Sequence, residues 1–151
     1  MIIRLAVTSD SAEIARLTNE LGYFADPSAI TNRLTSLTDQ PNQLVLVAVS
    51  EEKIVGWLQA HASVALESGY RVEIVGLIVS ADSRRCGVGR RLVERAEQWA
   101  QEIGAETVVV RSNTKRTESH HFFPALGYSV SKTQTVYRKL LKKAPKPGSV
   151  G

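Results

Sequence analysis

Residues 83–90 carry the residue types that most plainly suggest chemistry, a glycine turn rich in arginine. The turn reads SRRCGVGR and runs directly into a stretch with helical periodicity. The first turn of a helix leaves backbone N–H groups unpaired and carries the positive end of the helix dipole. Glycines at 87 and 89 let a phosphate approach the backbone without a Cβ in the way. The turn therefore predicts a binding site for a phosphate-bearing ligand, and its alternative is a plain helix start with solvated arginines.

Two common nucleotide-binding motifs fit this turn poorly. A Walker A loop needs G-x-x-x-x-G-K-S/T, a string that the sequence lacks. A Rossmann fingerprint needs a third small residue where Leu92 stands, and no βαβ unit opens the chain. A P-loop-like nucleotide binder is therefore the weakest interpretation of the turn.

Hydrophobic periodicity predicts a single mixed α/β domain with the element order βααβββαβαββ. Continuous apolar runs predict buried strands, and Gly76 within one of them predicts a bulge or a ligand close to the backbone. Asp10 followed by Glu13 predicts a capping box at the first helix. The expected strands are 2–7, 44–49, 54–64, 72–79 and 107–110, the expected helices are 11–21, 27–41, 88–103 and 116–126, and a hairpin over 128–141 is expected last.

The charge distribution argues against a nucleic-acid partner. The formal net charge is +4, but five positive charges lie in the last fourteen residues, and the rest of the chain has 14 basic and 15 acidic side chains. A terminal block of like charge is usually a solvated tail, so we expect a domain over 1–141 and a basic, disordered tail over 142–151. No apolar run approaches the roughly 20 residues of a membrane helix. With no signal sequence and a single cysteine, the sequence is typical of a cytoplasmic protein without a membrane partner.

The glycine turn and its surroundings resemble the cofactor core of the GNAT superfamily of acyl-CoA-dependent N-acyltransferases. The resemblance rests on the strand EIVGLIVSADSR at 73–84, on the Arg-x-x-Gly-x-Gly turn with its helix, and on SHHFFPALGY at 119–128. The last segment is similar to the family's A-H-x-F-Y-x-x-L-G-F/Y helix. Because the order of elements matches too, the resemblance covers residues 2–141. It implies a single-domain GNAT fold, a central, mostly antiparallel mixed sheet with a splayed, bulged cofactor strand and flanking helices.

The resemblance implies that the cofactor is coenzyme A, bound as acetyl-CoA. In the family, backbone N–H groups of the turn bind the pyrophosphate, and the splayed strand pairs with the pantetheine arm. The N–H of Leu77 is also expected to donate to the thioester carbonyl oxygen and stabilise its developing charge. The implied cofactor-binding residues are Leu77, Ile78 and Val79 on the strand, Arg84, Arg85, Cys86, Gly87, Val88, Gly89 and Arg90 in the turn, and Asn113, or else a turn-forming asparagine, after the fifth strand.

The implied reaction is transfer of an acetyl group to a primary amine by direct attack in a ternary complex. An ammonium group has no lone pair, so a proton must leave it before attack. Glu73, in a strand expected to be apolar, stands where protein-lysine members of the family have the general base; a structural glutamate with water as the proton relay is the alternative. Where many relatives have a tyrosine as general acid, this chain has Phe123. Water, His120, Tyr128 or Tyr137 would then serve, or the thiolate would leave unassisted.

The acceptor amine is left open between a small molecule and a protein lysine or N-terminus. Tyr23, Phe24, Glu67 and Tyr70 are expected to line its side of the groove, on loops that vary widely among such folds. No metal site is expected, because no Cys, Asp or Glu stands at ligand spacing. The main alternative to an enzyme is a module of the same fold that binds coenzyme A without turnover. Dimers are frequent in the family, so a homodimer is one possible assembly.

Overall fold

The computed structural model of the chain describes residues 1–111 and 119–142. The chain divides into two units, Met1–Arg116 and Thr117–Gly151. The first unit contains a five-stranded sheet with helices on both faces, so the mixed α/β class predicted from the sequence is confirmed. The second unit contains one short helix and an extended segment.

The sheet of the first unit follows the chain order β1-β2-β3-β4-β5. Neighbouring strands are antiparallel from β1 to β4, and β5 runs parallel to β4. A parallel pair needs a crossover connection, and the helix between β4 and β5 supplies it. The strands are β1 (Ile2–Leu5), β2 (Gln43–Ser50), β3 (Lys53–Ala65), β4 (Gly69–Val79) and β5 (Thr107–Val110).

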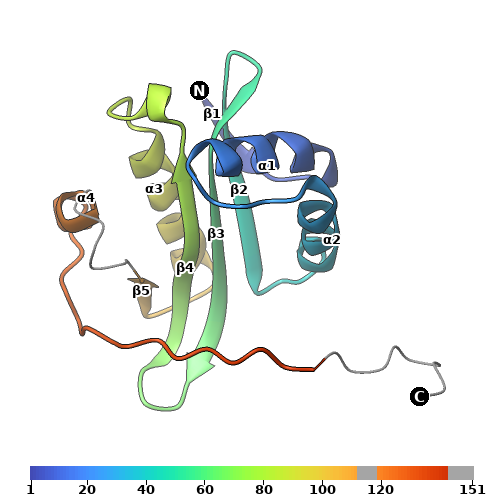
Figure 1. The fold of residues 1–151 in the computed structure, drawn as a ribbon. Helices are drawn as coiled ribbons and strands as arrows, with labels where there is room; N and C mark the ends of the chain where they lie inside the picture. The colour runs from blue at the N-terminus through green and yellow to red at the C-terminus, as the bar shows by residue number, and fades with distance from the viewer. Residues whose placement is uncertain (112–118, 143–151) are drawn as a thin grey trace. The chain divides into compact units, whose positions relative to one another are not determined.

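Helices cover the two faces of the sheet unequally. Helices α1 (Ser11–Glu20) and α2 (Pro27–Thr38) lie on one face, and α3 (Val88–Glu102) crosses the other (Figure 1). Short 3₁₀ turns at Thr8–Asp10 and Ala81–Ser83 lead into α1 and out of β4. Because both faces of the central strands are covered, the apolar run in β2 is buried, as the sequence predicts.

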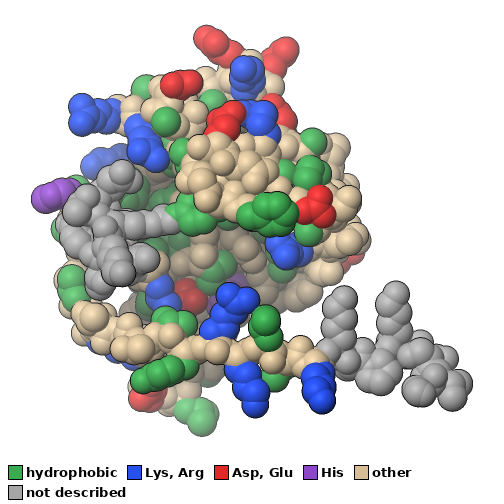
Figure 2. All heavy atoms as spheres, viewed as in Figure 1, with side chains coloured by type: hydrophobic (Ala, Val, Ile, Leu, Met, Phe, Trp, Pro, Cys, Tyr) green, Lys and Arg blue, Asp and Glu red, His purple; other side chains and the backbone are tan. Residues whose placement is uncertain are grey.

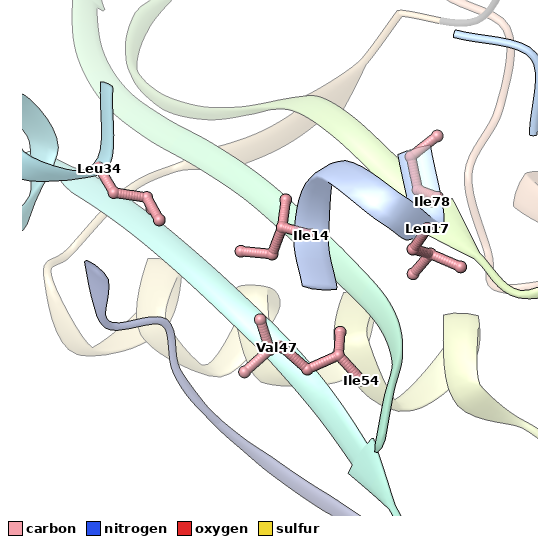
Figure 3. Packing of buried hydrophobic residues seen from close by; sticks show 6 residues of the cluster. All are labelled: Ile14, Leu17, Leu34, Val47, Ile54 and Ile78. Atoms are coloured by element: carbon pink, nitrogen blue, oxygen red, sulfur yellow. The ribbon is translucent and has the colours of Figure 1, made fainter. Parts of the chain in front are cut away.

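A tightly packed cluster joins α1 and α2 to the sheet. Ile14 and Leu17 of α1 and Leu34 of α2 point toward side chains of the three central strands (Figure 3). The strand members of this cluster are Val47, Ile54 and Ile78, and each of the six residues is at most 8 % exposed. Since Ile78 belongs to the predicted cofactor strand, its side chain holds that strand in place. Its backbone pairs with Trp57 of β3, so of the three predicted strand residues only Leu77 and Val79 have N–H groups on the other edge.

The predicted bulge lies next to Gly76. The pairing of β3 with β4 shifts between Gln59 and Ala60, which face Gly76 and Ile74, so Val75 is the extra residue. A Cβ on Gly76 would come within 2.7 Å of the Trp57 ring, and the Trp57 indole N–H donates to Thr18 Oγ1 on α1 at 3.0 Å. The packed Trp57 ring therefore accounts for the glycine at this position.

The capping box predicted at Asp10 and Glu13 is wrong. Asp10 is the N-cap residue of α1, but its side chain makes no capping hydrogen bond to the helix. Its carboxylate instead accepts hydrogen bonds from Nη1 and Nη2 of the Arg4 guanidinium group and from the backbone N–H of Val7, at 2.8 to 2.9 Å. The ion pair with Arg4, six residues earlier, outcompetes the local cap, because charge-assisted bidentate bonds are stronger than neutral ones.

The second unit differs from the prediction at its C-terminal end. Helix α4 spans Ser119–Ala125, but residues 128–142 form no strand, so the expected hairpin is absent from the described part of the chain. Val130, Tyr137 and Leu141 are 86 %, 90 % and 84 % exposed. The alternating pattern that predicts strands reflects only local preference, whereas a strand also needs a neighbour to complete its hydrogen bonds.

Charge is mixed over the face seen in Figure 2. Acidic and basic side chains alternate around the top of that face, with no continuous basic region there. Among the described residues, no helix combines the length and the apolar character needed to cross a membrane.

Candidate active site

One edge of β4 is left without a partner strand beyond Ile74. Strand β5 pairs only with Arg71–Ile74, so within the described residues nothing is paired with that edge from Val75 onward. The backbone N–H of Ser80 donates to the Val55 carbonyl on the β3 side at 2.8 Å. Because successive N–H groups alternate sides along a strand, those of Leu77 and Val79 point to the opposite, unpaired edge. An extended ligand arm could pair there as an added strand would.

The glycine turn presents a second group of backbone donors. Gly87 is the N-cap of α3 with φ +79°, and Arg85 also has a positive φ of 66°. The first N–H group used inside the helix is that of Arg91, which donates to the Gly87 carbonyl at 3.0 Å. Among the described residues, no hydrogen bond is recorded for the N–H groups of Arg85, Gly87, Val88, Gly89 and Arg90. Such a set of orphaned donors at the positive end of a helix suits a diphosphate.

Side chains in the turn are largely exposed, except for that of Val88, which packs into the core. Val88 is 3 % exposed and fixes the start of α3, where its Cγ1 lies 2.9 Å from the position of a Cβ on Gly56. Arg84, Arg85, Cys86 and Arg90 lie at the surface. Cys86 is an exposed free thiol whose N–H donates to the Ser83 carbonyl at 3.3 Å. The turn therefore combines a fixed backbone with accessible donors.

Glu73 lies among charged groups rather than in the apolar surroundings that the sequence suggests. Its Oε1 is 3.4 Å from Arg111 Nη2 and 4.0 Å from Arg71 Nη2. The Glu73 side chain is 13 % exposed, that of Arg71 22 % and that of Arg111 60 %. The apolar character of the strand resides in the opposite face, where Val72 and Ile74 are buried.

The residues around Glu73 share the sheet face that carries α1 and α2. Trp57 and His61 alternate onto this face of β3, and the register places His61 opposite Glu73. A shallow hollow of about 350 Å³ on this face is lined by Gln59 and by residues of α2, namely Asn32, Arg33, Ser36 and Leu37. Glu73 and His61 do not line it, so the hollow is distinct from the surroundings of the candidate base.

The four predicted acceptor residues are not brought together. Tyr23 and Phe24 lie in the loop between α1 and α2, where Phe24 is 93 % exposed. Glu67 lies in the turn between β3 and β4, at the other end of the sheet (Figure 1). Tyr70 alternates with Arg71, so its side chain belongs to the α3 face, opposite Glu73. Only the α1–α2 loop lies on the same face as Glu73.

Other predicted site residues belong to the second unit or fall outside the described residues. Asn113 and the side chain of His120 lie outside the described residues. Phe123 is half-buried, with its ring at 4.9 Å from that of Phe122 and 5.8 Å from that of Tyr128, both in edge-to-face geometry. Tyr137 is 90 % exposed. Phe123 thus has a packing role within its own unit.

Arg71, Arg111 and His61 were not singled out from the sequence. A usable signal did exist, because Arg71 and Glu73 are two residues apart in a strand and so must share a face. Arg111 directly follows the short strand TVVV, whose parallel register with β4 could not be read from the sequence. The described residues contain no group of three His, Cys, Asp or Glu side chains able to hold a metal ion.

Comparison with known proteins identifies relatives of the same kind. The acetyltransferase (GNAT) family matches residues 11–128. The aminoalkylphosphonate N-acetyltransferase of Salmonella typhimurium is 29 % identical over 135 residues, which cover 85 % of each chain. YhfO of Bacillus subtilis, described as an uncharacterized N-acetyltransferase, is 26 % identical over 133 residues, covering 85 % of this chain and 89 % of the relative.

Solved structures agree in fold. An aminoglycoside 6′-N-acetyltransferase from Acinetobacter haemolyticus superposes with a TM-score of 0.80 at 19 % identity, covering 94 % of this chain and all of that one. A protein described as a transcriptional regulator from Bacillus halodurans has a TM-score of 0.82 at 22 % identity, covering 91 % and 99 %. With the family match over most of its length, the chain belongs to the GNAT family of N-acetyltransferases.

Proposed function

We propose that the protein transfers an acetyl group from acetyl-CoA to a primary amine by direct attack within a ternary complex. The observation that carries this proposal is the unpaired edge of β4 beside the donor-rich turn at the start of α3. Both features fit coenzyme A, since its pantetheine arm carries amides and its diphosphate is anionic. Acetyl-CoA would supply the acetyl group as a thioester.

The backbone has two tasks in this proposal. The N–H groups of the turn bind the diphosphate, with the helix dipole adding to the attraction. The unpaired donors are those of Arg85, Gly87, Val88, Gly89 and Arg90. The N–H of Val79 pairs with the arm, and that of Leu77 donates to the thioester carbonyl oxygen as negative charge develops on it. Because these donors are backbone groups fixed by Ile78 and Val88 in the core, they need no reorganisation when the ligand binds.

Glu73 holds or accepts the proton that the acceptor ammonium must lose. It lies on the sheet face that carries α1 and α2, four residues before Leu77 on the same strand. The side chain of Glu73 is 13 % exposed. The proton can therefore pass to its carboxylate either directly or through one water molecule. His61, opposite Glu73, lies within the same row of side chains.

The leaving thiolate requires little help. A thiol of the cysteine type has a pKa near 8.5, so departure as a thiolate costs little at neutral pH. Acetyl transfer is therefore compatible with Phe123 at the position of the family's general acid, although its ring has no proton to donate. Phe123 also supports the rival proposal, a domain that binds coenzyme A without turnover.

We infer that the acceptor is a small amine. The Salmonella typhimurium relative, 29 % identical to this chain, is named for aminoalkylphosphonates, which are small amines. A compartment that contains acetyl-CoA, such as the cytoplasm, is required by the same proposal.

The proposal is tested by release of thiol from acetyl-CoA in the presence of a panel of primary amines, with the acetylated product identified by mass spectrometry. We expect Glu73→Gln to lower kcat about 100-fold or more, since a general base typically contributes a factor of this order. Coenzyme A affinity, measured by calorimetry, should stay unchanged. Glu94→Gln, an exposed change on α3, is the matched control.

Two results would contradict the proposal at different levels. An unchanged rate in Glu73→Gln would remove the base role and leave the enzyme assignment in place. Tight binding of coenzyme A with no amine-dependent thiol release by the unaltered protein would favour the binding module instead.

A further inference from the structure

The immediate surroundings of Glu73, the candidate base, carry more positive than negative charge. Glu73 has the guanidinium groups of Arg71 and Arg111 near one of its oxygens, so the three side chains together have one positive charge in excess. Arg71 comes from β4, and Arg111 directly follows β5. They reach the same spot because Val109 is in register with Glu73 across the parallel pair.

The three charged groups do not satisfy one another. The contacts of 3.4 and 4.0 Å are longer than the 2.7–3.2 Å of a good N–H···O hydrogen bond. Arg71 Nε is buried and has no hydrogen-bond partner among the described residues. The Nε and Nη2 atoms form the edge of a guanidinium group that binds oxyanions in bidentate fashion. Arg71 therefore has an unsatisfied donor near Glu73, and Arg111, with 60 % of its side chain exposed, is the more accessible of the two guanidinium groups.

The excess of donors limits the kind of amine that fits. An acceptor with its nitrogen at Glu73 must place its remaining atoms close to the two guanidinium groups. A second ammonium group there would be repelled, as on a polycationic amine such as an aminoglycoside. A phosphonate or carboxylate group would instead form charge-assisted, bidentate hydrogen bonds with arginine. Since both arginines lie within 4.0 Å of Glu73, the spacer between amine and anion must be short.

We propose that the acceptor is a short primary amine bearing a compact oxyanion, a phosphonate or a carboxylate, which Arg71 and Arg111 bind while the amine lies against Glu73. This inference rests on the proposed function. In the reaction the ammonium proton passes to Glu73, and the freed nitrogen lone pair forms the N–C bond to the acetyl carbon. The C–S bond then breaks, and its electron pair leaves on the coenzyme A sulfur as a thiolate. The nitrogen, which became positively charged when the N–C bond formed, loses its second proton to solvent and gives a neutral amide.

The test compares kcat/KM for thiol release with four acceptors: 2-aminoethylphosphonate, β-alanine, the neutral ethanolamine and the cationic kanamycin. We expect at least one anionic acceptor to exceed both ethanolamine and kanamycin by about tenfold or more, and the comparison between the first two identifies the oxyanion. Arg111→Gln should abolish this preference, mainly through KM of the anionic acceptor, and Arg111→Lys should restore part of it. Arg111 is chosen because its side chain is 60 % exposed, so the fold does not depend on it.

Arg16→Gln is the matched control, an exposed arginine of α1 paired only with Glu20 on the helix surface. It should leave the preference unchanged. A second readout, the melting temperature of the coenzyme A complex with 2-aminoethylphosphonate or ethanolamine, does not need turnover.

The outcomes distinguish failure of this inference from failure of the proposed function. Turnover of neutral or cationic amines at equal efficiency, or a preference that survives Arg111→Gln, would overturn this inference and leave the proposed function standing. Arg111-dependent stabilisation by 2-aminoethylphosphonate without turnover of any amine would support the inference and contradict the proposed function. Neither turnover nor stabilisation would overturn both.

Discussion

At the scale of single residues, Asp10 illustrates how a charge pair can replace a local cap. The bidentate hydrogen bond from the Arg4 guanidinium group lowers the pKa of the Asp10 carboxyl, burial opposes this effect, and the hydrogen bond from the Val7 N–H adds to it. The same contact raises the pKa of Arg4. The pair fastens β1 to the start of α1, and α1 in turn holds Trp57 through Thr18.

We therefore expect Asp10→Asn to lower the free energy of unfolding by about 1–2 kcal/mol at pH 7. Because the pKa of Asp10 is lowered in the folded protein, its stabilising contribution is complete above the unfolded-state pKa near 4 and is lost as pH falls through the lowered value. Urea unfolding at a series of pH values measures the difference between the two proteins.

The difference should shrink below about pH 4. Asp26→Asn is the control, since Asp26 is an exposed N-cap of α2 whose side chain makes no capping hydrogen bond. An equal loss in both variants, or a loss that does not change with pH, would contradict the role of the Arg4 pair.

Some of the residues near Glu73 can be predicted from the sequence and others cannot. Glu73 and Leu77 follow from a resemblance to known motifs, and both lie on β4 as expected. Arg111 does not, because its closeness to Glu73 depends on the register between two strands whose paired residues, such as Glu73 and Val109, are 36 positions apart in sequence. That register is set by the packed fold. The sequence alone also does not reveal that the Trp57 ring occupies the space beside Gly76.

At the scale of elements, β4 and the start of α3 carry the proposed cofactor site. Periodicity and glycine positions predict these elements closely: β5 has the predicted bounds, and α3 starts at Val88 as expected. Element ends are less predictable, because they depend on partners elsewhere in the chain. The first strand ends at Leu5 rather than residue 7, and the second helix at Thr38 rather than near Pro41.

Gly87 allows a matched test of the turn. Gly87 and Gly104 both have positive φ, at 79° and 82°, and a Cβ on either would meet no atom within 4 Å. Alanine at either position should therefore cost about 1 kcal/mol of stability through backbone strain alone. Only Gly87→Ala should also weaken coenzyme A binding, by about tenfold, because it alone disturbs the N–H donors at the N-terminus of α3.

Calorimetric titration of coenzyme A, with urea unfolding of the same proteins, measures both effects. Equal affinities in Gly87→Ala and Gly104→Ala would place the diphosphate elsewhere.

At the scale of the first unit, the five-stranded sheet has helices on both faces. Helix α3 lies on one face, and α1 and α2 lie on the other, which also carries the Glu73 side chain (Figure 1). The fold class was predictable because strand and helix periods are strong along residues 1–111. The hairpin predicted over 128–141 is wrong for the described residues, since a strand there needs a partner strand that local preference cannot supply.

Residue-resolved amide exchange by NMR, with and without acetyl-CoA, tests the central claim most directly. The account predicts slower exchange on binding for the amides of Leu77 and Val79 and for those from Arg85 to Arg90. Ile78 and Ser80, whose amides already face β3, should change little. Unaltered exchange at Leu77 and Val79 in the presence of saturating acetyl-CoA would contradict the account.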